Sequence, residues 1–198
     1  MDCVLADYRF HAIQIAGHNP DDFPHISWTM DEVFPNKNVR WKIITDYGRR
    51  KFFAELPEYP WTQEVVRAAL RTGDIRFLTG VGRSEDERGK RDWLEEHFPD
   101  IKNIADLLCT VRPGQEKSAW LLPGDVLVDD LDKNVLGWIE AGGQALWFPG
   151  VETASARRHA NWYVMEGSFE RDLAETVNIA QALCQPGMVR EFVTRVNM

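Results

Sequence analysis

The sequence predicts an α/β domain built on a parallel sheet that is covered by helices on both faces. Short apolar runs of strand length recur between residues 60 and 148. Segments of helical character alternate with these runs, which is the pattern of a buried parallel sheet. At 198 residues the chain is long enough for one well-buried core, so we expect a single domain over residues 1–198.

Gly, Pro and Asp mark the ends of several predicted elements. The first helix begins after Pro60, has apolar residues at helical spacing, and breaks at Thr72-Gly73-Asp74. A charged helix over residues 85–98 ends before Pro99, and a further helix over residues 131–141 ends at Gly142-Gly143. Residues 117–122 are predicted to form a helical turn, and the predicted strands occupy residues 75–78, 105–110, 126–128 and 145–148.

Two segments lie outside this alternation. Residues 9–60 are irregular and rich in Pro, Asn, Asp and aromatic residues, and we expect them to form a small cap inserted into the core domain. Residues 151–198 are expected to form a C-terminal helical tail, in which residues 168–184 have the spacing of an amphipathic helix.

Composition and charge exclude several classes of function. A net charge of -8 argues against a surface that binds duplex nucleic acid. No apolar run approaches the roughly 20 residues that cross a bilayer, and the first residues do not read as a secretion signal. The three cysteines are too scattered for a disulfide framework or a zinc site. We therefore expect a soluble, cytoplasmic protein; whether it forms a homodimer is left open.

Polar residues follow two of the predicted strands. Thr79 comes directly after residues 75–78, and the pair Asp129-Asp130 comes directly after residues 126–128. In a parallel sheet these positions share one edge, where ligands bind. Adjacent carboxylates repel each other unless a cation or hydrogen-bond donors stabilise them, and Mg²⁺ prefers such oxygen ligands. The alternative is local: Asp130 caps the next helix, Asp129 is a solvated turn residue, and Thr79 belongs to a turn.

The order of several segments resembles the haloacid dehalogenase superfamily and, within it, the 5′(3′)-deoxyribonucleotidase-like family. The resemblance covers roughly residues 1–148 and implies a Rossmann-like parallel sheet with a cap inserted after the first motif. Its most specific part is the acidic segment at residues 125–130. The matching segments are MDCVLADY at residues 1–8, FFAELP at 52–57, IRFLT at 75–79, GKRDWLEEHF at 89–98 and DVLVDD at 125–130.

The resemblance implies Mg²⁺-dependent hydrolysis of a small phosphate ester, such as a nucleotide or deoxynucleotide, through an aspartyl phosphate. Asp2 would be the general acid and base, and its backbone carbonyl would meet the metal together with Asp129 or Asp130. Thr79 and the amide of Gly80 would hold phosphate oxygens, and Lys90 would offset the charge of the phosphate. Lys117 is a second candidate for that lysine, with a solvated helix residue as the alternative reading.

Substrate choice would be made by aromatic residues of the cap. A base could stack on a slot formed by Trp28, Trp41, Phe52 and Phe53, as the deoxyribonucleotidase resemblance implies. The alternative for each of these side chains is ordinary packing in the core.

The sequence departs from the family at the first motif, because the nucleophilic aspartate would stand immediately before Met1. Either the working protein is longer at its N-terminus, or the chain is an inactive binding protein of the same fold. The missing strand is central, so its removal would leave a gap between its neighbours unless residues 3–8 fill it. A second alignment makes Asp7 the strand-end carboxylate, but Arg9 then stands where the acid should be. Cys3 also replaces the family's Gly.

Overall fold

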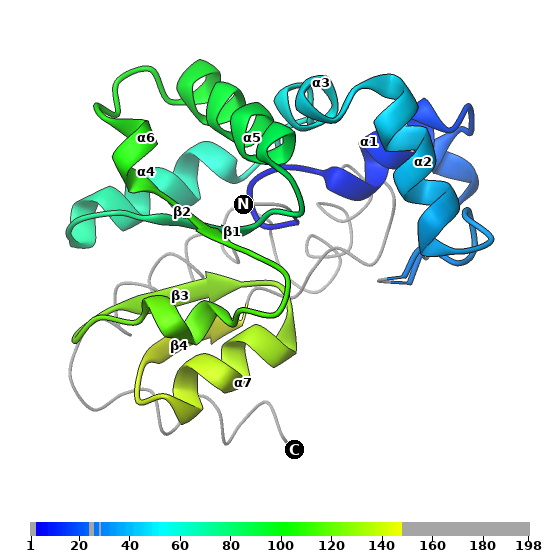
Figure 1. Ribbon diagram of the computed structural model, residues 1–198. Coiled ribbons are helices and arrows are strands. Elements are labelled where there is room, and N and C mark those ends of the chain that lie inside the picture. The colour runs from blue at the N-terminus through cyan, green and yellow to red at the C-terminus, as the bar shows by residue number, and fades with distance from the viewer. Residues whose placement is uncertain (1–2, 24–25, 28, 148–198) are drawn as a thin grey trace, which may run out of the picture.

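The computed structural model describes residues 3–23, 26–27 and 29–147 (Figure 1). The α-helices are α1 (Tyr8–Ile15), α2 (Lys37–Tyr47), α3 (Arg49–Ala54), α4 (Thr62–Thr72), α5 (Ser84–His97), α6 (Ile104–Leu107) and α7 (Asp132–Glu140). Two short 3₁₀ helices are η1 (Pro20–Asp22) and η2 (Lys117–Trp120), and the strands are β1 (Phe77–Gly80), β2 (Leu108–Val111), β3 (Val126–Asp129) and β4 (Gln144–Trp147).

The strands form two separate parallel pairs. β1 pairs with β2 from Phe77↔Leu108 to Gly80↔Val111, and β3 pairs with β4 from Val126↔Gln144 to Asp129↔Trp147. Helix α5 connects the first pair and α7 connects the second, as parallel neighbours require. Mixed helices and small parallel sheets are compatible with the predicted α/β class, but the described residues do not join the two pairs into one sheet.

Several predicted boundaries differ from those observed. β1 starts two residues later than predicted, at Phe77, and residues 104–107 form the single-turn helix α6 where we expected the start of a strand. The four residues Ile104–Leu107, which include the charged Asp106, are too few for their pattern to distinguish a helix from a strand, and Asn103 precedes them with a left-handed backbone. The predicted helical tail at 151–198 lies outside the described residues.

Residues 3–7 lie against residues 57–62 and do not pair with any of the four strands. The backbone turns tightly, with Cys3 N donating to the Ala6 carbonyl at 2.8 Å. Trp61 Nε1 donates to the Val4 carbonyl at 2.9 Å, and the only strand-like contact of this segment is a bridge between Ala6 and Glu58. The N-terminal segment therefore does not pair with β1 or β3, although Val4 and Leu5 line the same cavity as Leu78 and Val128.

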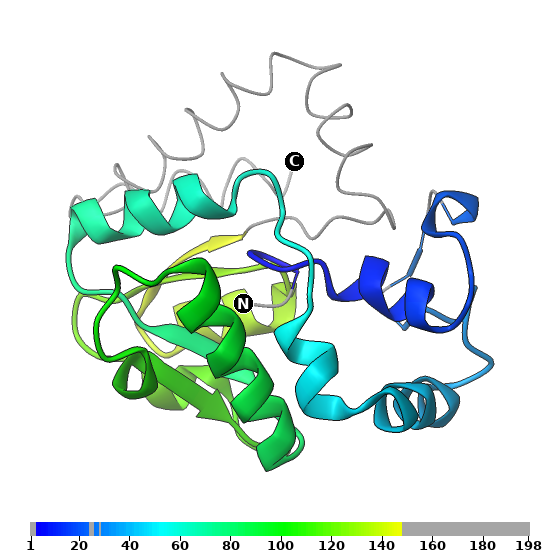
Figure 2. The ribbon, with the colours of Figure 1, turned by 90° about the horizontal axis from the view of Figure 1, so that it is seen from above.

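Most of the core consists of aromatic and aliphatic side chains from α1 to α5, whereas a smaller cluster lies beneath the second strand pair. Trp93, Phe52 and Ile44 are completely buried in the larger core. The smaller cluster contains Leu127, Val135, Trp138 and Ala145, and Leu78 of β1 packs against it. Figure 2 shows the blue and cyan segment with α1 and α2 to one side of the strands. Whether residues 9–60 constitute an inserted cap stays a prediction.

Helices α3 and α5 approach each other closely at Gly89. A Cβ atom at this position would lie 2.3 Å from the Arg50 carbonyl oxygen and 2.8 Å from Phe53 Cβ. Only glycine fits there without displacing one of the helices. This contact fixes the position of Lys90, the next residue along α5.

None of the described helices is long and apolar enough to span a membrane.

Candidate active site

A cavity of about 490 Å³ lies where β1 and β3 end, between these strands and the helices of the N-terminal third. The strand β1 contributes Thr79 and Gly80, and the loop after β3 contributes Asp130. This is the strand edge at which the sequence predicted a site. The predicted site residues that line it are Trp41, Phe53, Thr79, Gly80, Lys90, Lys117 and Asp130.

Lys90 reaches this cavity from α5, although its side chain is almost completely buried. Its Nζ donates to Thr79 Oγ1 at 2.8 Å and to the Gly80 carbonyl at 2.7 Å. The ammonium also lies 4.8 Å from the centre of the Phe53 ring. A buried ammonium is costly unless it is well hydrogen-bonded or faces an anion. Thr79 and Lys90 thus form a rigid polar pair at the end of β1.

The loop that follows β1 is held by Asp86. Its carboxylate accepts hydrogen bonds from Gly82 N at 2.9 Å and from Arg83 N at 3.0 Å. Both amides precede the first residue of α5, and a negative charge near the N-terminus of a helix is stabilising. Arg49 of α3 binds the same carboxylate through two hydrogen bonds of 2.6 Å, and both side chains are buried. The pair joins α3 to the loop beside Thr79.

The two adjacent aspartates have different surroundings. Asp129 is buried and accepts hydrogen bonds from Lys117 Nζ at 2.5 Å, Leu131 N at 3.0 Å and Asn134 Nδ2 at 2.9 Å. Asp130 lines the cavity, and burial together with the negative charge of Asp129 raises the pKa of Asp130 to about 6. Asp129 therefore organises the loop, while Asp130 is the carboxylate that a ligand in the cavity would meet.

The donor set is compatible with a partly hydrated Mg²⁺ ion. Among the described residues, the structure contains no group of three or more His, Cys, Asp or Glu side chains that could hold a metal ion by themselves. Mg²⁺ does not require one, because it commonly binds through one or two carboxylates, water and substrate phosphate oxygens. A cation beside Asp130 would also offset the burial and the repulsion from Asp129 that together raise the pKa of this carboxyl. Asp2, which was also predicted as a ligand, lies outside the described residues.

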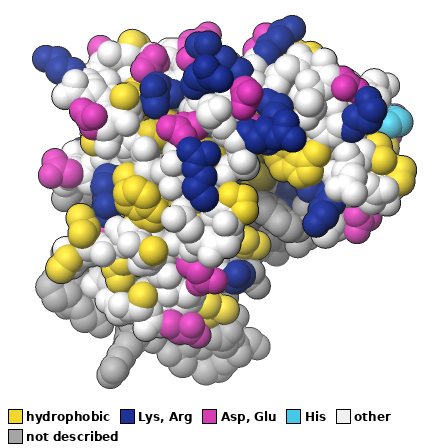
Figure 3. All heavy atoms as spheres, in the orientation of Figure 1, with side chains coloured by type: hydrophobic (Ala, Val, Ile, Leu, Met, Phe, Trp, Pro, Cys, Tyr) yellow, Lys and Arg dark blue, Asp and Glu magenta, His cyan; other side chains and the backbone are white. Residues whose placement is uncertain are grey.

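Three arginines that the sequence did not predict as site residues also line the cavity. Arg9 comes from α1, Arg40 from α2 and Arg112 from the residue after β2. With Lys90 and Lys117 they outnumber the lining carboxylates Asp86 and Asp130, although the chain as a whole has a net charge of -8. Their positions share no local motif, so no sequence signal could have grouped them. Figure 3 shows Lys and Arg side chains gathered over the upper half of the molecule, which holds α3 and α5.

The aromatic residues that were predicted to form one slot do not all line the cavity. Trp41 and Phe53 line the cavity, and the Arg49 guanidinium lies 4.5 Å from the centre of the Trp41 ring. Phe52 points instead into the core, where its ring lies 5.3 Å from Tyr8 and 5.0 Å from His11. Trp28 lies outside the described residues.

Cys3 and Asp7 belong to the segment that resembles the first motif of the family. Cys3 lines the cavity with a backbone φ of +58°, a conformation in which glycine is unstrained and other residues are not. Asp7 is buried and caps α1 by accepting a hydrogen bond from Phe10 N at 2.9 Å. It is not among the residues that line the cavity. This geometry favours a structural role for Asp7 over the role that the second alignment gives it.

Comparison with known proteins identifies one family. The family described as 5′ nucleotidase, deoxy (pyrimidine), cytosolic type C protein matches residues 1–163. No curated protein matches the chain. The matched range contains every residue that lines the cavity.

Proposed function

This chain belongs to the cytosolic type C family of 5′ deoxy-pyrimidine nucleotidases, and we propose from that membership that it is a Mg²⁺-dependent phosphomonoesterase. Its substrate would be a nucleoside or deoxynucleoside monophosphate. The observation that carries the proposal is the buried Lys90–Thr79 pair at the end of β1, in a cavity with an excess of cationic side chains. We further propose a Rossmann-like core with a cap over residues 9–60, a tail over 151–198, and a cytoplasmic location.

The chain's own residues would bind and orient the phosphate. Thr79 Oγ1 and the backbone amide of Gly80 would donate to its oxygens, because both groups lie at the strand end beside the cavity. Lys90 and Lys117 would neutralise its negative charge. Lys117 would also hold Asp129 in place through their 2.5 Å ion pair.

Asp130, supported by Asp129, and the backbone carbonyl of Asp2 would hold Mg²⁺. When bound, the ion would neutralise the crowded oxygens of the phosphate and of the attacking carboxylate. This assignment leaves its remaining positions to water and phosphate oxygens, in keeping with the coordination that Mg²⁺ prefers.

The nucleophile would be an aspartate two positions before Asp2, which lies upstream of Met1. One of its carboxylate oxygens would form a bond to phosphorus while the ester P–O bond breaks, and Asp2 would give its proton to the departing alkoxide. The deprotonated Asp2 would then remove a proton from water, which attacks phosphorus and releases the aspartate. Asp2 cannot also be the nucleophile, since one group cannot attack phosphorus and hold the proton of the leaving group.

Two forms of the protein test this proposal. One starts at Met1, and the other carries an N-terminal extension with an apolar strand that ends in Asp. On a panel of deoxynucleoside monophosphates with Mg²⁺, we expect phosphate release from the extended form and very slow or no release from the shorter one. Changing the added Asp to Asn should abolish the activity. Robust turnover by the form that starts at Met1, lost in Asp7→Asn and kept in Asp2→Asn, would overturn the assignment.

We propose that Trp41, which lines the cavity, recognises the base of the substrate by stacking on it. Stacking of a base on an aromatic ring is worth about 1–3 kcal/mol, so Trp41→Ala should weaken binding of a deoxynucleotide by about tenfold or more. Binding of inorganic phosphate should be unchanged, because the protein groups that we propose bind phosphate belong to β1 and α5. Equal losses for both ligands in calorimetry would assign Trp41 to folding rather than to recognition.

A further inference from the structure

We propose that the 490 Å³ cavity binds a second phosphate group, through Arg9 and Arg40, in addition to the phosphate at the end of β1. The ligand class is a nucleotide with phosphate groups at two separate positions of its sugar, such as a deoxynucleoside 3′,5′-bisphosphate. This assignment names a substrate class for the proposed nucleotidase site, and it therefore rests on the proposed function.

Two of the other cationic side chains that line the cavity already face a carboxylate. Lys117 Nζ forms a 2.5 Å ion pair with Asp129, and Arg112 Nη2 lies 2.7 Å from Glu87. Lys90 belongs to the phosphate site that we propose at the end of β1. The cationic side chains that α1 and α2 contribute to the cavity have no role in that first site.

Arg40 of α2 is held in place on one side of its guanidinium, while another of its donors lacks an acceptor. Its Nη1 donates to the Thr29 carbonyl at 3.0 Å. Its Nε is buried and has no hydrogen-bond partner among the described residues. A buried charged donor without an acceptor is costly. Phosphate oxygens match the planar fork of a guanidinium in geometry and in charge.

Arg9 adds a second guanidinium to the same part of the cavity. It comes from α1, which packs against α2, and its side chain is buried. Met30, which follows Thr29, lines the cavity with a backbone φ of +59°. Residues other than glycine adopt this conformation infrequently, and such strained positions cluster where proteins hold ligands. The backbone beside Arg40 is thus shaped in a way that is common at binding sites.

The two groups of phosphate-binding side chains come from different parts of the fold. Thr79 lies at the end of β1 and Lys90 on α5, whereas Arg9 and Arg40 belong to the helices that Figure 2 shows to one side of the strands. A ligand with phosphates on either side of its sugar can meet both groups at once. Trp41, the residue after Arg40, lines the same cavity, so the base can stack there while the sugar lies between the two phosphate sites.

Calorimetry on the full chain with Mg²⁺ tests the second site, with thymidine 5′-monophosphate and thymidine 3′,5′-bisphosphate as the probes. We expect the bisphosphate to bind about tenfold or more tightly than the monophosphate, because hydrogen bonds to charged groups are strong. Arg40→Gln removes the charge but keeps a donor for the Thr29 carbonyl, so it should bring the two affinities close together. Arg40→Lys, which keeps the charge without the planar fork, should retain part of the preference.

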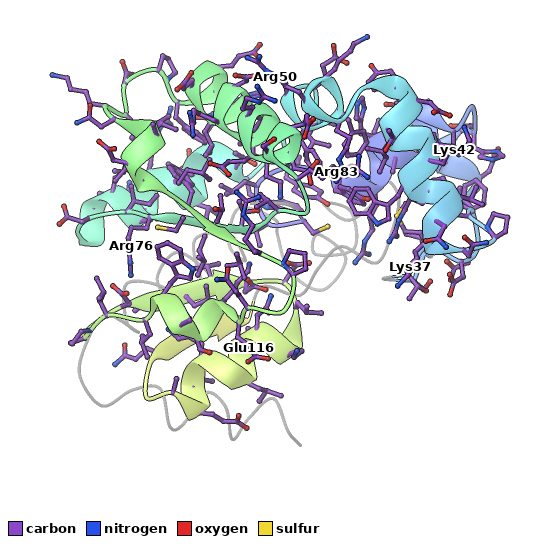
Figure 4. All side chains as sticks on the ribbon, in the orientation of Figure 1. Lys37, Lys42, Arg50, Arg76, Arg83 and Glu116 are labelled. Atoms are coloured by element: carbon purple, nitrogen blue, oxygen red, sulfur yellow. The ribbon has the colours of Figure 1, made fainter. Side chains whose placement is uncertain are left out.

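Lys42→Gln is the matched control, because it removes one positive charge from the same helix. Lys42 is 74% exposed, pairs with Asp46 and is not among the residues that line the cavity. Figure 4 shows it on the side of α2 that faces away from the strands. We expect this variant to keep the full preference for the bisphosphate, and thermal unfolding confirms that the variants fold. Equal loss of the preference in Lys42→Gln and Arg40→Gln would overturn the second site.

Thymidine 5′-diphosphate tests where the second phosphate binds. Its extra phosphate is joined directly to the first, so Arg40→Gln should weaken its binding less than that of the 3′,5′-bisphosphate. Equal weakening of the two ligands would contradict a separate site on α1 and α2.

The outcomes distinguish this proposal from the proposed function. Binding of the monophosphate without a preference for the bisphosphate would overturn the second site and leave the proposed function intact. A preference that depends on Arg40, without phosphate release from any probe by the N-terminally extended form, would support the second site and count against the aspartyl phosphate mechanism. Failure of all three probes to bind would overturn both.

Discussion

Lys90 illustrates what a single buried side chain can contribute. Its ammonium is bonded to Thr79 and Gly80, and the resemblance to a phosphate-binding helix picked it out of a charged segment that contains several basic residues. Periodicity alone would not have distinguished it from Arg88 or Arg91. The arginines of the cavity were not predicted, because Arg9, Arg40 and Arg112 come together only through tertiary packing.

His11 provides a prediction about pH. Its ring is buried, lies 5.0 Å from Phe52, and its Nε2 has no hydrogen-bond partner among the described residues. Burial lowers the pKa of His11 below its ordinary value of 6.5, with Lys51 adding to the effect and Glu55 opposing it. The folded state thus favours neutral His11, whereas the unfolded chain protonates it near 6.5.

The free energy of unfolding should therefore contain a contribution from His11 that is fully present above about pH 6.5 and is lost as the pH falls toward the lowered pKa. Urea unfolding between about pH 8 and pH 5 should show a shallower loss of stability for His11→Phe than for the parent. Parallel pH curves for the two proteins would contradict the burial of a neutral imidazole.

At the scale of elements, the packing of α3 on α5 determines which of two adjacent aromatic residues reaches the cavity. Phe53 does and Phe52 does not, because the close approach at Gly89 fixes how α3 is turned. The sequence placed both residues in one slot, since neighbouring positions in an irregular segment carry no sign of their direction. The strand ends at Thr79 and Asp129 were predictable because Gly, Pro and Asp delimit those short runs.

Gly89→Ala should destabilise the protein, because the added Cβ would lie 2.3 Å from the backbone carbonyl of Arg50. Overpacking of this kind typically costs about 1–3 kcal/mol. Gly137→Ala in α7 is the control, since the nearest atom is a flexible carboxylate oxygen at 3.6 Å, and alanine favours a helix by up to about 1 kcal/mol. Urea unfolding of both variants measures the difference. A Gly89→Ala protein as stable as the parent would show that the helices are not in close contact.

The ion pair between Arg49 and Asp86 should be important for the stability of the α3–α5 interface. Arg49→Met leaves the Asp86 carboxylate buried without its cation, a change that typically costs about 3–5 kcal/mol. Lys42→Met is the matched control, because the Lys42–Asp46 pair is exposed and such pairs contribute less than about 1 kcal/mol. Adding Asp86→Asn to Arg49→Met should recover part of the loss. Equal effects of Arg49→Met and Lys42→Met on unfolding would contradict this interpretation.

At the scale of the whole molecule, the main feature is the separation of β1–β2 from β3–β4. The sequence predicted the four strands and a gap beside the first motif, unless residues 3–8 fill that gap. Among the described residues, this segment pairs with none of the four strands. Hydrogen bonds from Trp61 and Tyr59 to the carbonyls of Val4 and Leu5 hold that segment against residues 59–61. These bonds join residues more than fifty positions apart and leave no local pattern in the sequence.

The central claim is that one cavity binds a phosphate group together with Mg²⁺, and calorimetry on the chain itself tests it most directly. Mg²⁺ is titrated into the parent, Asp130→Asn and the control Glu116→Gln, each with inorganic phosphate present. Asp130 lines the cavity, whereas Glu116 is an exposed carboxylate that pairs with Lys133. We predict that Asp130→Asn weakens Mg²⁺ binding by about tenfold or more and that Glu116→Gln leaves it unchanged. Mg²⁺ binding of equal affinity in all three proteins would contradict the account.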